Sequence, residues 1–313
     1  MSETSDDQEP PGEGEQRQPR GSACAAPSVA LVIQGRPRDL GGFSVRRVLP
    51  AAERRLVGPF IFLDQMGPAD ILPGRGFDVR PHPHIALATL TYLFSGEIVH
   101  RDSLGFEQTI RPGDVNWMVA GRGIVHSERV APALRQTGFH IHGLQCWLAL
   151  PREQEECAPS FVHHPRASIP RLTRAGVELD VVAGSAFGQR SPVEVFSPTL
   201  YVHARLPAGA SLEIEREHEE RAVYVIEGSV ECEEQRFEPG ALLVLEPHVT
   251  PVLRALEPTR LMLLGGAHLP GSRHIYWNFV SSSLERIEQA KRDWQEDKFA
   301  KVPGDDERIP LPS

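Results

Sequence analysis

The chain has 313 residues, 40% hydrophobic and 24% charged, enough to bury a core in two domains of ordinary size. Its 42 acidic residues outnumber 33 lysines and arginines, which gives a net charge of −9. No basic stripe could neutralise phosphates and no run of eighteen apolar residues occurs, which argues against direct nucleic-acid binding and against a membrane span. The cysteines show no paired spacing, which predicts free thiols and a cytoplasmic protein. They are Cys24, Cys146, Cys157 and Cys232.

Residues 1–27 are acidic, rich in Pro, Gly and Gln, and poor in large apolar groups, so we expect a disordered tail. From Val29 onward, short apolar stretches alternate with turn signals. One example is Ala86–Leu93, which is followed by Ser95-Gly96. Short strands separated this densely by Gly, Pro and Asp are typical of an all-β sandwich or barrel.

A weak internal repeat links the two halves of the chain. Tyr92–Gly96 (YLFSG) matches Tyr224–Gly228 (YVIEG) at an offset of 132 residues, and a Pro-Gly turn follows each copy. The repeat predicts two copies of one β-fold in tandem. The expected segments are the tail 1–27, an N-terminal β-domain 28–151, a linker 152–171, a C-terminal β-domain 172–270 and a final segment 271–313 containing a helix.

The final segment carries a helix pattern. Ser282 and Glu285 have capping-box spacing, with Ser282 as the expected N-cap. Apolar residues then recur at three- and four-residue steps and mark one helix face. They are Leu284, Ile287, Ala290 and Trp294. The helix should end before Pro303 and pack its apolar face on one of the β-domains.

Two pairs of potential metal ligands stand out. His82-x-His84 places two imidazoles on one face of a strand, and His126-x-Glu128 follows 44 residues later. If the two strands are neighbours, three imidazoles and one carboxylate converge, a set that suits a first-row divalent metal better than Ca²⁺ or Mg²⁺. A single His-x-His is more often a surface or satisfied core pair, but the second pair and the nearby glycines favour the metal interpretation.

These residues resemble a known family. Gly76-x5-His82-x-His84 resembles the first cupin motif, and Gly123–His126 resembles part of the second. The run Arg111–Glu128 closely resembles the signature of the pirins. Further pirin-like segments are His100–Gly105, Gly143–Pro151 and Trp277–Ser283, so the resemblance extends from about Val29 to the end of the chain.

The resemblance implies a bicupin, two jelly-roll-like β-barrels in tandem with metal in the N-terminal barrel only. The metal ligands carried over are His82, His84, His126 and Glu128. The metal expected is Fe(II), with Mn, Ni, Co, Cu or Zn as other divalent candidates. The activity implied is a dioxygenase that opens a flavonol such as quercetin with O2, and Glu128 would also take the substrate's proton as catalytic base.

A second, non-enzymatic function is also implied, because some pirins bind transcription factors or metabolic enzymes in an iron-dependent way. The acidic tail and the acidic stretch Glu213–Glu238 would then contact a protein partner, although both also serve solubility. The two functions differ in what metal loading controls, oxygen uptake or partner binding.

The sequence departs from the pirin pattern at Ala88, where pirins typically have Glu, and at Ala149, where they usually have Asn. In the second repeat the first histidine pair maps to Ile214 and Arg216, so we expect the C-terminal domain to hold no metal.

Three other features have plainer interpretations. His140-x-His142 is expected in a packed strand, and His163-His164 on a solvent-facing linker. Cys146 should be an inert buried thiol.

Overall fold

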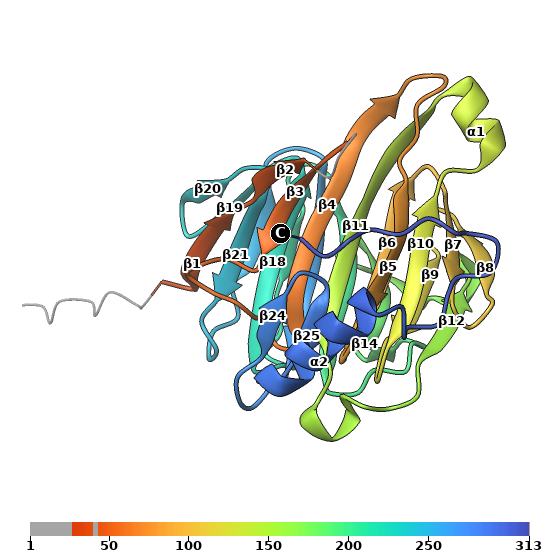
Figure 1. The fold of residues 1–313 in the computed structure, drawn as a ribbon. Helices are drawn as coiled ribbons and strands as arrows, with labels where there is room; N and C mark the ends of the chain where they lie inside the picture. Colours follow the sequence, from red (N-terminus) through yellow and green to blue (C-terminus); the bar gives the residue numbers. More distant parts are fainter. Residues whose placement is uncertain (1–26, 40–42, 313) are drawn as a thin grey trace, which may run out of the picture.

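The computed structural model describes residues 27–39 and 43–312 (Figure 1). The predicted disordered tail therefore lies, except for its last residue, outside the described part. The chain forms two β-barrels in tandem with a helix near the C-terminus, so the predicted all-β bicupin architecture is confirmed. None of the helices in the described ranges is long and apolar enough to cross a membrane.

The barrel that holds the predicted ligands consists, within the described residues, of a seven-stranded and a four-stranded sheet. The larger sheet has the spatial order β12 (Ser160–His164), β9 (Val115–Val119), β6 (Leu87–Ser95), β11 (Phe139–Ala149), β4 (Phe60–Ile71), β3 (Ser44–Leu49) and β2 (Arg36–Asp39). The smaller has the order β5 (Val79–His84), β10 (Ile124–Arg129), β7 (Ile98–Asp102) and β8 (Glu107–Ile110). A short helix, α1 (Pro132–Thr137), connects β10 to β11.

The other barrel repeats this plan over the described residues, with an eight-stranded and a four-stranded sheet. The larger sheet has the order β1 (Val29–Gln34), β21 (Ala241–Leu245), β18 (Glu220–Glu227), β23 (Thr259–Gly266), β16 (Thr199–Leu206), β14 (Val177–Ala186) and β13 (Arg171–Arg174), with β15 (Gln189–Arg190) on β14. The smaller has the order β17 (Ser211–Glu213), β22 (Val252–Ala255), β19 (Val230–Cys232) and β20 (Gln235–Phe237).

Two strands, β1 and β12, belong to sheets that could not be predicted from their positions in the sequence. β1 pairs antiparallel with β21, so the first described strand completes the C-terminal barrel, as Figure 1 shows in red beside blue-green. β12, from the predicted linker, pairs with β9 of the N-terminal barrel. His163 and His164 are therefore half-buried on a strand, and His163 Nδ1 lies 2.8 Å from Asn116 Oδ1. The alternation of apolar residues predicts a strand but not the edge to which it adds.

The two large sheets pack face to face on one shared core. Leu90 and Cys146 of the N-terminal barrel and Tyr201 and Met262 of the C-terminal barrel are all buried in it. The Cys146 thiol lies 3.1 Å from the Tyr201 hydroxyl, and burial raises the pKa of Cys146 to about 12, which agrees with the predicted inert thiol. Because the core is continuous, the barrels cannot move apart without exposing apolar surface.

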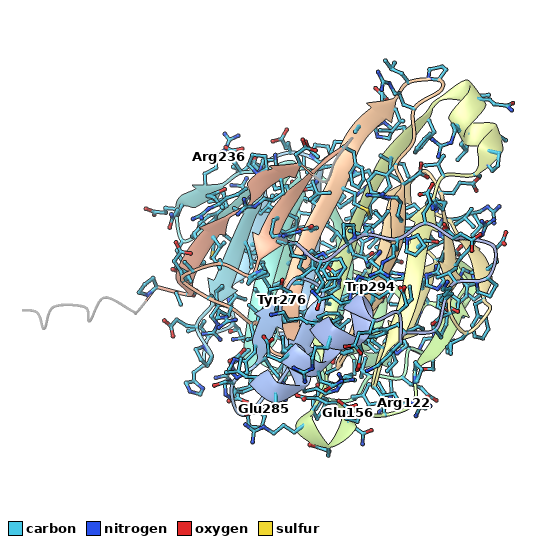
Figure 2. All side chains as sticks on the ribbon, viewed as in Figure 1. Arg122, Glu156, Arg236, Tyr276, Glu285 and Trp294 are labelled. Atoms are coloured by element: carbon cyan, nitrogen blue, oxygen red, sulfur yellow. The ribbon has the colours of Figure 1, made fainter. Side chains whose placement is uncertain are left out.

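The C-terminal segment folds back onto the N-terminal barrel. It forms a hairpin of β24 (His274–Tyr276) and β25 (Phe279–Ser281), followed by helix α2 (Leu284–Gln295). Figure 2 shows Tyr276 and Trp294 at this helix, in front of the N-terminal barrel. Three residues of the predicted apolar face are buried there against Val125 of β10 and Ile85, which directly follows β5. They are Ile287, Ala290 and Trp294.

The structure corrects two details of the predicted helix. Ser283, not Ser282, is the N-cap, because its Oγ accepts a hydrogen bond from the Arg286 amide at 3.2 Å. Ser282 is engaged elsewhere: its amide and hydroxyl both donate to the buried Glu155 carboxylate. Leu284 is 58% exposed and lies off the packed face, since the helix has barely begun there.

Candidate metal centre

Three of the four predicted ligands converge. His82 and His84 lie on β5 and His126 lies on β10, which are antiparallel neighbours with His126 directly opposite His82. The alternation of side chains puts all three imidazoles on the same face. Their potential ligand nitrogens lie within 4.8 Å of one another, and all three side chains are buried. The predicted neighbouring of the two strands is thereby confirmed.

Hydrogen bonds to the backbone orient the two histidines of β5. His82 Nδ1 lies 2.8 Å from the carbonyl oxygen of Arg80, and His84 Nδ1 lies 3.1 Å from that of Asn278. A carbonyl oxygen only accepts, so each Nδ1 must carry the proton and donate. The Nε2 atom of each ring therefore keeps a free lone pair, and it is this atom that can bind a metal.

His126 is oriented by a pair of residues on the next strand. Its Nδ1 lies 3.4 Å from His100 Nδ1, and His100 Nε2 lies 3.0 Å from Asp102 Oδ2. Since the Asp102 carboxylate accepts from His100 Nε2–H, His100 Nδ1 is left to accept from His126 Nδ1–H. His126 Nε2 then also presents a lone pair, and it lies 3.1 Å from His84 Nε2.

His100 and Asp102 were not predicted as site residues, although they fall in a pirin-like segment. The available signal was their own i, i+2 spacing on β7, which pairs with β10 on the side opposite β5. Asp102 is completely buried, and its Oδ1 accepts from the amides of Leu104 and Phe106. The carboxylate is thus held by backbone donors from the turn that follows β7.

A shared proton cannot explain the close approach of His84 Nε2 and His126 Nε2 near neutral pH. Burial lowers the pKa of His82 to about 4 and holds the pKa values of His84 and His126 well below the ordinary range. The three rings are therefore neutral, and two lone pairs face each other across 3.1 Å with no proton between them. A shared cation removes that repulsion, and three neutral imidazoles are a donor set typical of first-row divalent metals. The residues present therefore fit a metal ion.

Glu128 lies beside the histidines but outside their cluster. It follows His126 by two residues on β10, where an irregularity in the pairing with β5 shifts the register between the two. Its side chain lines the same cavity as the three rings. Burial raises the pKa of Glu128 to about 7, against the opposing effect of the Thr91 hydroxyl. A carboxyl group with this pKa exchanges protons readily at neutral pH.

The cavity above the histidines has a volume of about 510 Å³ and largely apolar walls. Phe62 and Trp147 stack at 3.9 Å with an interplanar angle of 11°. The Arg47 guanidinium lies 4.5 Å from the Phe62 ring centre and forms a two-point ion pair with Asp64. The C-terminal segment closes one wall of the cavity with Ile275, Trp277, Asn278 and Ile309. An aromatic molecule of modest size fits such a space.

The departures from the pirin pattern lie away from this cavity. Ala88 is buried in the core between the two large sheets, and Ala149 is buried near the edge of β11; neither lines the cavity. His142 is buried but contacts Gln65 and Glu227, while His140 is exposed and pairs with Asp70. His142 is thus packed as predicted, whereas His140, two residues nearer the exposed end of β11, is not.

Comparison with known proteins covers nearly the whole described chain. The family model Pirin matches residues 42–148, and Pirin C-terminal cupin domain matches residues 201–300. A pirin-like protein of Caulobacter vibrioides is 50% identical over 91% of this chain and 99% of its own. Rat pirin is 31% identical over 88% of this chain and 94% of its own. A crystal structure of quercetin 2,3-dioxygenase from Acinetobacter baumannii superposes with a TM-score of 0.84 at 30% identity, over 90% of this chain and 95% of that one.

Proposed function

The chain belongs to the pirin family, and we propose that it is a metal-dependent dioxygenase that opens the ring of a quercetin-like flavonol with O2. One observation carries the proposal: three neutral imidazoles with inward lone pairs lie at the base of an aromatic-walled cavity. The relative named quercetin 2,3-dioxygenase supports the substrate class. The cytoplasm is part of the same proposal, since Cys146, Cys157 and Cys232 are free.

The proposed ligands are His82, His84 and His126 through Nε2, with Glu128 as the fourth. Fe(II) is the metal we expect, with Mn, Ni, Co, Cu or Zn as alternatives. A metal held by these four residues would supply Lewis acidity toward the substrate's oxygens. The hydrogen bonds of His82, His84 and His126 through Nδ1 hold the rings in place for this task.

The residues around the histidines have distinct proposed tasks. Glu128 takes the proton of the flavonol 3-hydroxyl at its carboxylate oxygen, for which a pKa of about 7 is well matched. Phe62 and Trp147 lie along the plane of an aromatic substrate and exclude water from it. Trp277 and Ile309, from the C-terminal segment, limit the length of the substrate that can enter.

Metal content and oxygen consumption test the proposal together. Protein purified without oxygen is measured by elemental analysis, then mixed with quercetin in an oxygen electrode after loading with Fe(II), Mn(II), Ni(II) or Cu(II). Wild type should bind one metal ion and consume O2, whereas His126→Ala should lose both. The matched control is His140→Ala, because His140 is exposed and pairs only with Asp70 outside the cavity.

The possible outcomes test the metal site and the proposed substrate separately. Bound metal without oxygen uptake from any flavonol would reject the dioxygenase proposal and leave the metal site. Absence of metal in the wild-type protein after loading would reject both.

A further inference from the structure

A second cavity lies at the seam between the two barrels, away from the histidines. It has a volume of about 180 Å³ and shares no lining residue with the cavity above the metal centre. Its walls come from β6 and the turn at Pro112 on one side and from β13, β14, β16 and β23 on the other. Four arginines line this seam cavity: Arg166, Arg171, Arg205 and Arg260.

His203, on β16, carries an unused hydrogen-bond donor. Its Nδ1 lies 3.0 Å from Arg205 Nη1, and a guanidinium nitrogen only donates. The Tyr92 hydroxyl lies 3.1 Å from the same Nδ1, while the Asp180 carboxylate is 3.6 Å away and too distant for a hydrogen bond. Nδ1 is therefore the acceptor, and the ring proton is on Nε2.

That Nε2–H group has no partner among the described residues, although the side chain is only 5% exposed. Burial lowers the pKa of His203 to about 4, so the ring is neutral and keeps this single proton near neutral pH. A buried donor without an acceptor is costly and rare in native proteins.

Arg205 provides a second unused donor at the same place. Its Nε donates to Glu178 at 2.9 Å and its Nη1 donates to Asp180 at 2.7 Å. Its Nη2 is buried and has no partner in the described part of the chain. Two donors of neighbouring residues on one strand are thus left for a group that the protein itself does not supply.

The lining of the seam cavity carries a net positive charge even after its acids are counted. Asp180 and Glu178 line it, and Glu227 lies 3.6 Å from Arg260. Among the lining residues, four arginines therefore face two carboxylates, while Asp114, which accepts from the Arg166 amide at 2.8 Å, and Glu227 lie beside the cavity without lining it. Asp180 is already engaged by Arg171 and Arg205 together. The Arg166 side chain has no acidic partner within 4.0 Å among residues 27–39 and 43–312.

We propose that the seam cavity binds a small oxyanion, a phosphate or a carboxylate, held by His203 Nε2, Arg205 Nη2 and the guanidinium of Arg166. An oxyanion supplies several acceptor lone pairs and a negative charge, which match the two unused donors and the surplus charge. A water molecule would satisfy the donors but not the charge. The site is independent of the metal centre, and its ligand contacts both barrels at once.

Calorimetric titration tests the inference on the full-length protein, with inorganic phosphate in one arm and malonate in the other. Sodium chloride keeps the ionic strength constant, because general screening would otherwise imitate binding. The informative variant is Arg166→Gln, since Arg166 is exposed and the substitution should leave the fold intact. The matched control is Arg236→Gln, an exposed arginine on the C-terminal barrel that does not line the cavity (Figure 2).

Wild type should bind at least one of the two probes saturably and with a rise in melting temperature, because the ligand binds only the folded chain. Arg166→Gln should weaken binding by about tenfold or more, the loss expected for one charge-assisted contact. Arg236→Gln should bind like wild type. Absence of saturable binding of both probes, or equal weakening in the two variants, would overturn the inference. Phosphate alone or malonate alone identifies which oxyanion the site takes.

Discussion

The buried His82 ring should make the metal-free protein sensitive to mild acid. Its pKa is lowered from 6.5 in the unfolded chain to about 4 in the fold, chiefly by burial. Between these two values the unfolded chain binds a proton that the folded chain does not. The contribution of His82 to stability is therefore complete above about pH 6.5 and is lost as the pH falls toward 4.

The size of the effect follows from the same two values. Each pH unit within that window costs about 1.4 kcal/mol for one group that titrates only in the unfolded chain. Between pH 7 and pH 5 the fold should lose about 2 kcal/mol through His82 alone. Substitution by glutamine removes the titration but keeps a polar side chain of similar size. The destabilisation of His82→Gln relative to wild type should therefore shrink by that amount over the same range.

Urea unfolding measured by tryptophan fluorescence at both pH values provides the test. A chelator keeps the protein metal-free, because a bound metal would compete with protons for Nε2. His140→Gln is the control, since His140 is exposed, and its unfolding free energy relative to wild type should not change with pH in this way. If the gap between His82→Gln and wild type is the same at pH 7 and pH 5, the argument that burial keeps this ring neutral is refuted.

Three further changes have defined outcomes. His100→Phe should weaken metal binding about 10- to 100-fold in a chelator competition, because His126 loses the partner that orients it; unchanged affinity would refute that role. Trp294→Ala should lower the free energy of unfolding by about 3–5 kcal/mol in urea titrations, because the side chain is buried under α2; a loss within the scatter of surface substitutions would contradict this packing. The proposed oxygenase rate should fall in wild type as the pH drops through the pKa of Glu128, which burial raises and a bound metal ion would lower. In Glu128→Gln the rate should be low and independent of pH in that range, and a retained wild-type profile would exclude Glu128 as the base.

The histidine triad was predictable from one short-range rule together with the condition that the two strands are neighbours. Side chains two apart share a strand face, and the His82 and His126 pairs lie on strands that became neighbours. The position of Glu128 was not predictable in the same way. Glu128 keeps the face of His126, because β10 pairs with β7 without interruption and the extra residue of the irregular pairing lies on β5. The shared face places the carboxylate in the same cavity, but the spacing does not say whether it comes as close to the rings as they come to one another.

Other features depend on contacts between distant parts of the chain. Ser282 and Ser283 are equivalent as caps by sequence, and the buried Glu155 decides between them by binding Ser282. The orientation of His126 depends on which strand flanks β10, which the spacing of His100 and Asp102 does not reveal. The family resemblance indicated the region in each case, but the partner became visible only with the fold.

The pairing of β1 with β21 determines whether either barrel can be produced as a separate fragment. The first described strand, β1, completes the C-terminal barrel, while the hairpin β24–β25 and helix α2 cover the N-terminal one. No single cut in the backbone can therefore release either barrel whole. A fragment made of the first half would present β1 without its partner strand and would leave the sheet of β5 and β10 uncovered. The second half would have an open edge beside β21, which is a template for association with another chain. β1 and the C-terminal hairpin and helix thus join the two barrels into one folding unit.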